Sequence, residues 1–75
     1  MPVKFEFGDY LKKEMIPFYI WDEIERFIYE KNNNISEADY TFRNVHALIG
    51  LAKYNNRIDD KVAYEIRCSL NKMNS

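Results

Sequence analysis

Residues 36–56 read SEADYTFRNVHALIGLAKYNN, and this stretch carries the clearest helical pattern of the chain. Ser36 is placed to cap the free amides of a first helical turn. The pair Asn55-Asn56 can end the helix, because asparagine tolerates the left-handed conformation of a C-terminal cap. Between these ends the core-facing positions recur every three or four residues, the period of an amphipathic helix. They are Ala38, Thr41, Phe42, Val45, Leu48, Ile49 and Ala52. The pattern predicts a helix over residues 36–55.

A second amphipathic stretch follows after a short break. Asp59 has the side chain of a helix N-cap, and its carboxylate also suits the positive end of the helix dipole. The apolar positions that follow lie on one helical face; they are Val62, Ile66, Leu70 and Met73. We therefore predict a helix over residues 59–73.

Pro17 divides the region upstream of these two helices. Proline disfavours helical geometry at the residue before it and suits the first turn of a new helix. After Pro17 comes one continuous apolar stripe, which ends before Asn32–Asn34; its members are Ile20, Trp21, Ile24, Phe27 and Ile28. The sequence predicts a helix over residues 17–31 and a short one over 10–16, so that the first helical region is broken or kinked at Pro17.

The breaks between the helical stretches are short, and short connections make sequential helices antiparallel neighbours. We therefore predict that residues 1–75 form a single all-α domain, a small three-helix bundle. Residues 1–8 are expected to form an extended N-terminal arm, because Val3 to Phe7 alternate apolar and polar side chains. Two roles remain open for this arm: it covers the open end of the bundle, or it pairs as a strand with a second copy or with a partner's sheet.

Composition narrows the class of protein. The formal net charge is −1, which gives no long-range attraction to nucleic acid or to anionic lipid. The single cysteine, Cys68, excludes an internal disulfide framework and favours a reducing, cytoplasmic location. Charged side chains near the N-terminus are unlike a signal peptide, and no apolar run approaches the ~20 residues of a membrane span. Asn, Ile, Lys and Tyr make up 29 of the 75 residues. Their codons are A/T-rich, which indicates a low-GC genome, and for so short a protein we expect that genome to belong to a phage or another mobile element.

None of the reactive residue types forms a recognisable catalytic site. His46, the only histidine, has no paired group that would make a proton-transfer or metal site. No clustered cation near Cys68 would activate its thiol, and the two glycines do not form a phosphate-binding loop. We predict no catalytic residue, no cofactor and no metal, and hence a non-enzymatic protein.

Aromatic residues are the most informative feature, since there are twelve of them in 75 residues. A bundle of this size can shelter Trp21, Phe27 and Phe42, with Phe18 a further candidate, but hardly all twelve. On the helix over 36–55 a second stripe lies opposite the core positions; it comprises Tyr40, Ala47, Leu51 and Tyr54, with Gly50 beside it. One interpretation is that a middle helix needs a wide apolar arc to contact both neighbours.

The alternative interpretation makes this second stripe a partner-binding surface. Tyrosine suits interfaces because it buries a large area at little cost in rotamer entropy and keeps a polar tip. The predicted partner-binding residues, with Tyr64 extending the surface, are Tyr40, Ala47, Gly50, Leu51, Tyr54 and Tyr64. The function favoured by this interpretation is a small protein-interaction module that regulates or inhibits a host protein, with a homodimer expected.

DNA binding is the second function to consider, because short helices joined by tight turns resemble helix-turn-helix proteins. The helix over 59–73 would then read the DNA in a dimeric transcriptional regulator. Its outward face carries Lys61, Arg67 and Lys72 against Asp60 and Glu65. So few free cations make few phosphate contacts and little affinity, and nucleic acid is the less favoured partner.

Overall fold

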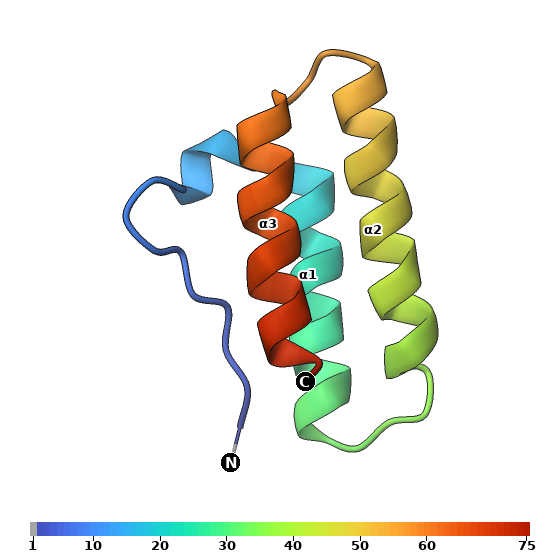
Figure 1. Cartoon of the computed structure of the whole chain (residues 1–75). Helices are drawn as coiled ribbons and strands as arrows, with labels where there is room; N and C mark the ends of the chain where they lie inside the picture. The colour runs from blue at the N-terminus through green and yellow to red at the C-terminus, as the bar shows by residue number, and fades with distance from the viewer. Residues whose placement is uncertain (1) are drawn as a thin grey trace.

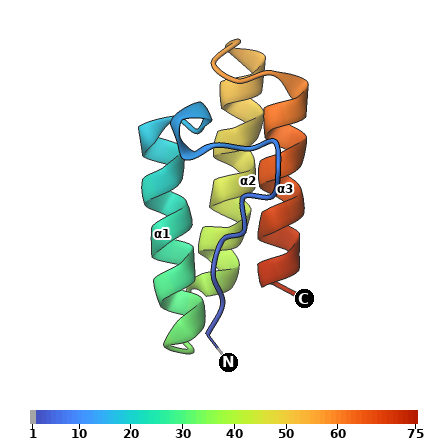
Figure 2. The ribbon, with the colours of Figure 1, turned by 90° about the vertical axis from the view of Figure 1, so that its left-hand side faces the viewer.

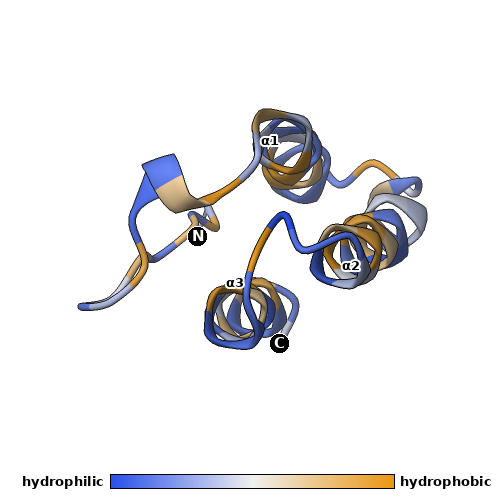
Figure 3. Ribbon diagram, turned by 90° about the horizontal axis from the view of Figure 1, so that it is seen from above, coloured by the Kyte–Doolittle hydropathy of each residue, from blue (hydrophilic) through white to orange (hydrophobic). Residues whose placement is uncertain are grey.

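The computed structural model describes residues 2–75 and contains three α-helices. After a 3-10 turn, η1 (Lys13–Met15), come α1 (Phe18–Asn32), α2 (Ala38–Tyr54) and α3 (Asp60–Met73). Sequential helices run antiparallel (Figure 1), and viewed end-on the three occupy the corners of a triangle (Figure 3). Residues 2–75 contain no strand. The predicted all-α three-helix bundle is confirmed.

The start of α1 differs from the prediction. Pro17 stands immediately before the helix, and its carbonyl accepts hydrogen bonds from the amides of Ile20 and Trp21, both at 3.0 Å. Ile16 is extended, with φ −97° and ψ 122°, because the proline ring excludes helical geometry at the preceding residue. The helix predicted over 10–16 is therefore reduced to the turn η1. Pro17 directly precedes the first α-helix, and residues 2–16 contain no α-helix for the proline to kink.

The predicted caps have different outcomes. Asp59 caps α3 as expected, since its Oδ1 accepts a hydrogen bond from the amide of Val62 at 2.8 Å. The predicted cap by Ser36 is wrong: α2 begins at Ala38, and the hydroxyl of Ser36 donates to the carboxylate of Glu37 instead. A backbone turn takes over this end, because the amide of Ala38 is already bound by the carbonyl of Ile35 at 3.1 Å.

Asparagines end the first two helices as predicted. Asn34, after α1, has φ 55°, and Asn56, after α2, has φ 59°. Both residues are in the left-handed region that asparagine tolerates better than most side chains. Each turn reverses the chain, so that α1, α2 and α3 can bring their apolar faces to a common axis.

The core lies along this axis and uses the predicted stripes. The side chains with 0% exposure come from all three helices: they are Ile20, Ile24, Phe27, Val45, Ile49, Ile66 and Leu70. Burying an aliphatic or phenyl side chain of this kind contributes about 1.5–3 kcal/mol. The core is complete without any side chain from the outer face of α2, and this leaves that face free.

The N-terminal segment packs along the side of the bundle. Residues 2–12 have neither helix nor strand, and they run between α1 and α3 (Figure 2). Phe5 is only 9% exposed, and its ring contacts those of Phe7 and Trp21 with centroids 4.9 and 5.5 Å apart. Ser69 of α3 donates a hydrogen bond to the carbonyl of Glu6. The segment therefore belongs to the core between α1 and α3 and does not cover an end of the bundle.

Candidate protein-binding surface

The outer face of α2 carries a row of exposed apolar side chains. Tyr40, Leu51 and Tyr54 are 67%, 58% and 85% exposed, and Ala47 between them is exposed as well. We call these four residues the α2 outer stripe. Their exposure excludes the interpretation in which the stripe packs against the neighbouring helices.

Helix geometry explains why the stripe is exposed. Residues seven apart in an α-helix lie almost on one line, since seven residues make nearly two turns. Tyr40, Ala47 and Tyr54 have this spacing, and they point away from the row that includes Val45 and Ile49. One end of the stripe is hollowed into a shallow pocket of about 310 Å³, lined by Tyr40, Arg43, Asn44 and Ala47.

Gly50 and Tyr64, the other two predicted residues, lie elsewhere. Gly50 is half-buried at the α2–α3 contact, where a Cβ would be 3.6 Å from Nη2 of Arg67. That guanidinium also donates to the carbonyl of His46 at 3.4 Å. Tyr64 is exposed on α3, beside Cys68 of the same helix, and the hydrogen bond to Cys68 raises the pKa of the tyrosine. Four of the six predicted residues thus share one face of α2.

Polar contacts with α1 border the α2 outer stripe. Asn44 of α2 donates from Nδ2 to the carboxylate of Glu23 at 2.7 Å. One turn earlier on α2, the hydroxyl of Thr41 donates a hydrogen bond to the carboxylate of Glu30, which also accepts one from Nε of Arg26 at 3.2 Å. The hydrogen bonds of Asn44 to Glu23 and of Thr41 to Glu30 hold α2 against α1 and so keep the stripe facing outward.

The burial of Glu30 departs from the sequence pattern. At four-residue spacing from Arg26 it is expected on a solvated face, but it is 6% exposed. The sequence does hold a signal, since Glu30 is three residues after buried Phe27 and therefore shares its side of α1. A polar partner on α2, Thr41, makes that position suitable for a carboxylate.

His46 is held between α2 and α3. Its ring packs edge-on against Phe42, with centroids 4.7 Å apart. Burial and the positive charge of Arg67 lower the pKa of His46, while a hydrogen bond with Asn71 opposes them. Within residues 2–75, no cluster of three or more side chains has the arrangement of a metal site.

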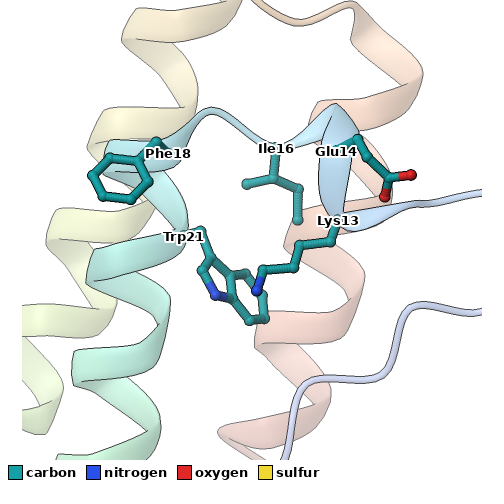
Figure 4. Close-up of a pocket in the computed structure, with 5 residues that line it drawn as sticks. All are labelled: Lys13, Glu14, Ile16, Phe18 and Trp21. Atoms are coloured by element: carbon teal, nitrogen blue, oxygen red, sulfur yellow. The ribbon is translucent and has the colours of Figure 1, made fainter.

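A second apolar surface lies at the start of α1, where Phe18 is 79% exposed (Figure 4). The pocket there has a volume of about 320 Å³ and is lined by Lys13, Glu14, Ile16, Phe18 and Trp21. The ammonium of Lys13 lies 5.2 Å from the centre of the Trp21 ring. Sequence reasoning missed this surface because it considered Phe18 and Trp21 as core residues. The available signal was Phe18 itself, which lies outside the stripe that begins at Ile20.

No family model, no curated protein and no solved structure matches this chain. Among the helices of residues 2–75, none has both the length and the apolar character needed to cross a bilayer. The function of the α2 outer stripe therefore has to be inferred from its own side chains.

Proposed function

We propose that this chain is a small non-enzymatic module that regulates or inhibits another protein by binding it through the α2 outer stripe. The observation that carries the proposal is the exposure of Tyr40, Leu51 and Tyr54 on one helix face, in a bundle whose core is complete without them. The largest exposed apolar patch on a typical monomeric protein covers about 300–600 Å² and is often an interaction site.

The chemistry of the stripe supports a protein partner. Tyrosine is enriched at the centres of interfaces, because its rigid ring buries a large area and its hydroxyl can still form a hydrogen bond. Ala47 between the aromatic residues allows a partner's backbone to approach α2 closely. The pocket beside Tyr40 could receive one anchoring side chain, as energetically dominant interface residues commonly require.

The proposal also covers the source of the protein and its cellular compartment. The richness in Asn, Ile, Lys and Tyr supports a phage or mobile element as the source. A lone cysteine supports the cytoplasm as the compartment. A small module of this kind would act on a host protein that it meets there.

The proposal is tested by capture of partners from a low-GC bacterial lysate on the immobilised chain. Leu51→Asp and Tyr54→Ala are expected to lose the captured protein while the far-UV circular dichroism keeps its helical form. Tyr29→Ala is the matched control, because Tyr29 is 63% exposed and lies on α1. If both stripe variants unfold, or if Tyr29→Ala loses the same protein, the proposal is wrong.

The contacts of α3 weigh against the DNA-binding alternative. Arg67 is engaged with the carbonyl of His46, and the ammonium of Lys61 lies 4.1 Å from the centre of the Tyr10 ring. Asp60 adds a negative charge beside Lys53. Retention on duplex DNA that weakens steeply with salt would overturn this judgement and favour a regulator of transcription.

A further inference from the structure

The N-terminal segment is held in place by side chains of α1 and α3. In the described part of the chain, residues 2–11 form no hydrogen bond between backbone groups. Instead, the carboxamide of Asn32 binds both polar groups of Val3: its Oδ1 accepts from the amide at 2.6 Å, and its Nδ2 donates to the carbonyl at 3.2 Å. On the other helix, the hydroxyl of Ser69 donates to the carbonyl of Glu6.

These contacts suit an extended peptide of more than one sequence. The three hydrogen bonds engage main-chain groups, which every peptide carries, so the selection comes from the side chains that point inward. Phe5 points inward, with a ring that is 9% exposed and lies 5.5 Å from that of Trp21. Around it, exposed residues alternate with half-buried ones, the pattern of an extended segment with one side on the protein (Figure 2). We call residues 3–7 the strap, and the side chains of Trp21, Asn32 and Ser69 that hold it the strap site.

The charge of the strap is poorly matched to its surroundings. Lys4 lines a hollow of about 250 Å³ together with Lys72 of α3, and Glu6 is on the same hollow. A second hollow beside Val3, of about 420 Å³, is lined by Lys31 of α1. Among residues 2–75, none of these three lysines has a salt bridge. The strap therefore adds a cation where two others already lie, and it leaves space unfilled on the surface of both helices.

We propose that the strap site is a second binding surface, whose external ligand is an extended, acidic segment of another protein. This segment carries aromatic side chains at the positions of Phe5 and Phe7 and a carboxylate at the position of Lys4. The strap is an intramolecular ligand of the same site, and the better-matched segment displaces it. The inference is independent of the proposed function, because the strap site belongs to α1 and α3 and not to the α2 outer stripe.

Displacement needs a hinge and a competitive advantage. Gly8 provides the hinge: its φ is 72°, which glycine adopts without strain, and a Cβ there would have nothing within 4 Å. The tether gives the strap an effective concentration of about millimolar order, so an external segment has to bind more tightly. A carboxylate in place of Lys4 provides this advantage, because attraction to Lys72 and Lys31 replaces repulsion. The strap of a second copy has no such advantage over the identical, tethered one.

Fluorescence anisotropy of labelled peptides, measured with the full chain, tests the strap site. The probes are acetylated peptides of residues 2–8, one with this chain's sequence and one with Lys4→Glu. A chain carrying Phe5→Ala, kept at low temperature, should bind the first peptide about tenfold more tightly than the wild-type chain, because its own strap competes less. A peptide that itself carries Phe5→Ala should not bind. Absence of binding by both probes to both chains at about 1 mM would overturn the strap site.

A chain carrying Lys4→Glu is the second variant, and it leaves the buried ring of Phe5 in place. Its strap matches the site better, so both peptides should bind it about fivefold more weakly than they bind the wild-type chain. Unchanged binding would show that strap and peptide do not compete for one site, and would overturn the displacement.

The preference for acidic ligands has its own test. At low salt the Lys4→Glu peptide should bind about fivefold more tightly than the peptide of this chain's sequence, and about 1 M salt should abolish the difference. Lys72→Gln in the chain should remove most of this preference. Lys53→Gln is the matched control, because it changes the net charge equally but lies on α2, where Lys53 pairs with Asp60. Equal affinities of the two peptides at low salt, or equal losses in the two lysine variants, would overturn the acidic ligand.

Two measurements separate this inference from other uses of the surface. Leu51→Asp should leave peptide binding unchanged, and a loss of binding in that variant would place the peptide on the α2 outer stripe and overturn the inference. Sedimentation velocity should show a monomeric wild-type chain at about 500 µM. A dimer that Phe5→Ala removes would show that a second copy's strap occupies the site, and would overturn the assignment to another protein. None of these results depends on partner capture by the α2 outer stripe.

Discussion

Phe5→Ala should destabilise the whole bundle, although Phe5 lies outside every helix. The ring is 9% exposed and has edge contacts with Phe7 and Trp21. Truncating a buried phenylalanine to alanine costs about 3–5 kcal/mol, and the lower end applies where the surroundings can relax into the space. The segment around Phe5 has no regular structure. We therefore expect a loss of about 3 kcal/mol in the free energy of unfolding.

This loss is large for so small a domain. At about 0.05–0.15 kcal/mol per residue, 75 residues have a stability of about 4–11 kcal/mol. One kcal/mol shifts the Tm of a domain of this size by about 4–8 °C, so Phe5→Ala should lower the Tm by about 10–25 °C. The variant remains folded at low temperature, which makes the change measurable.

Thermal and urea denaturation followed by far-UV circular dichroism measure this change. The matched control is Phe18→Ala, because Phe18 is 79% exposed and its truncation should alter stability by less than about 0.5 kcal/mol. If the two variants have the same Tm, Phe5 does not belong to the cooperative unit. The assignment of the N-terminal segment to the core between α1 and α3 would then be wrong.

Two further predictions concern the buried Thr41–Glu30 pair and the half-buried His46. Thr41→Val removes a donor from the buried carboxylate of Glu30 and should cost about 1–3 kcal/mol; adding Glu30→Leu should recover part of that loss in urea denaturation, and strictly additive costs would contradict the coupling. Burial, and after it the positive charge of Arg67, lowers the pKa of His46 from 6.5. As the pH falls, His46 is therefore protonated in the unfolded chain before it is protonated in the folded protein. Stability should therefore decrease as the pH falls below about 6.5, and His46→Gln should flatten this slope; an unchanged slope would show that His46 does not cause it.

Some structural features of the chain depend only on nearby residues, and these could be predicted from the sequence. Asp59, Asn34 and Asn56 were readable from the sequence, because a cap or a left-handed residue acts on backbone groups within a few positions. The helical stripes were readable for the same reason, since periodicity depends on helix geometry alone. The capping role expected of Ser36 failed because the backbone turn from Ile35 already satisfied the helix start.

Other positions were decided by what packs against them. Glu30 is buried because Thr41, on another helix, supplies a hydrogen-bond donor. Phe5 is buried because the chain before α1 returns along the space between α1 and α3. Such contacts join residues far apart in the sequence, so periodicity within one segment does not report them.

The sequence by itself determined three helices, their order and the existence of two apolar rows on residues 38–54. Only the tertiary structure decided whether the second row also packs against neighbouring helices or faces water, because its helical spacing is compatible with both. The row of Val45 and Ile49 meets α1 and α3, and this leaves Tyr40, Leu51 and Tyr54 without a partner in the chain's own core. The candidate site is thus defined by which helix faces the bundle buries, and this depends on how the three helices pack together.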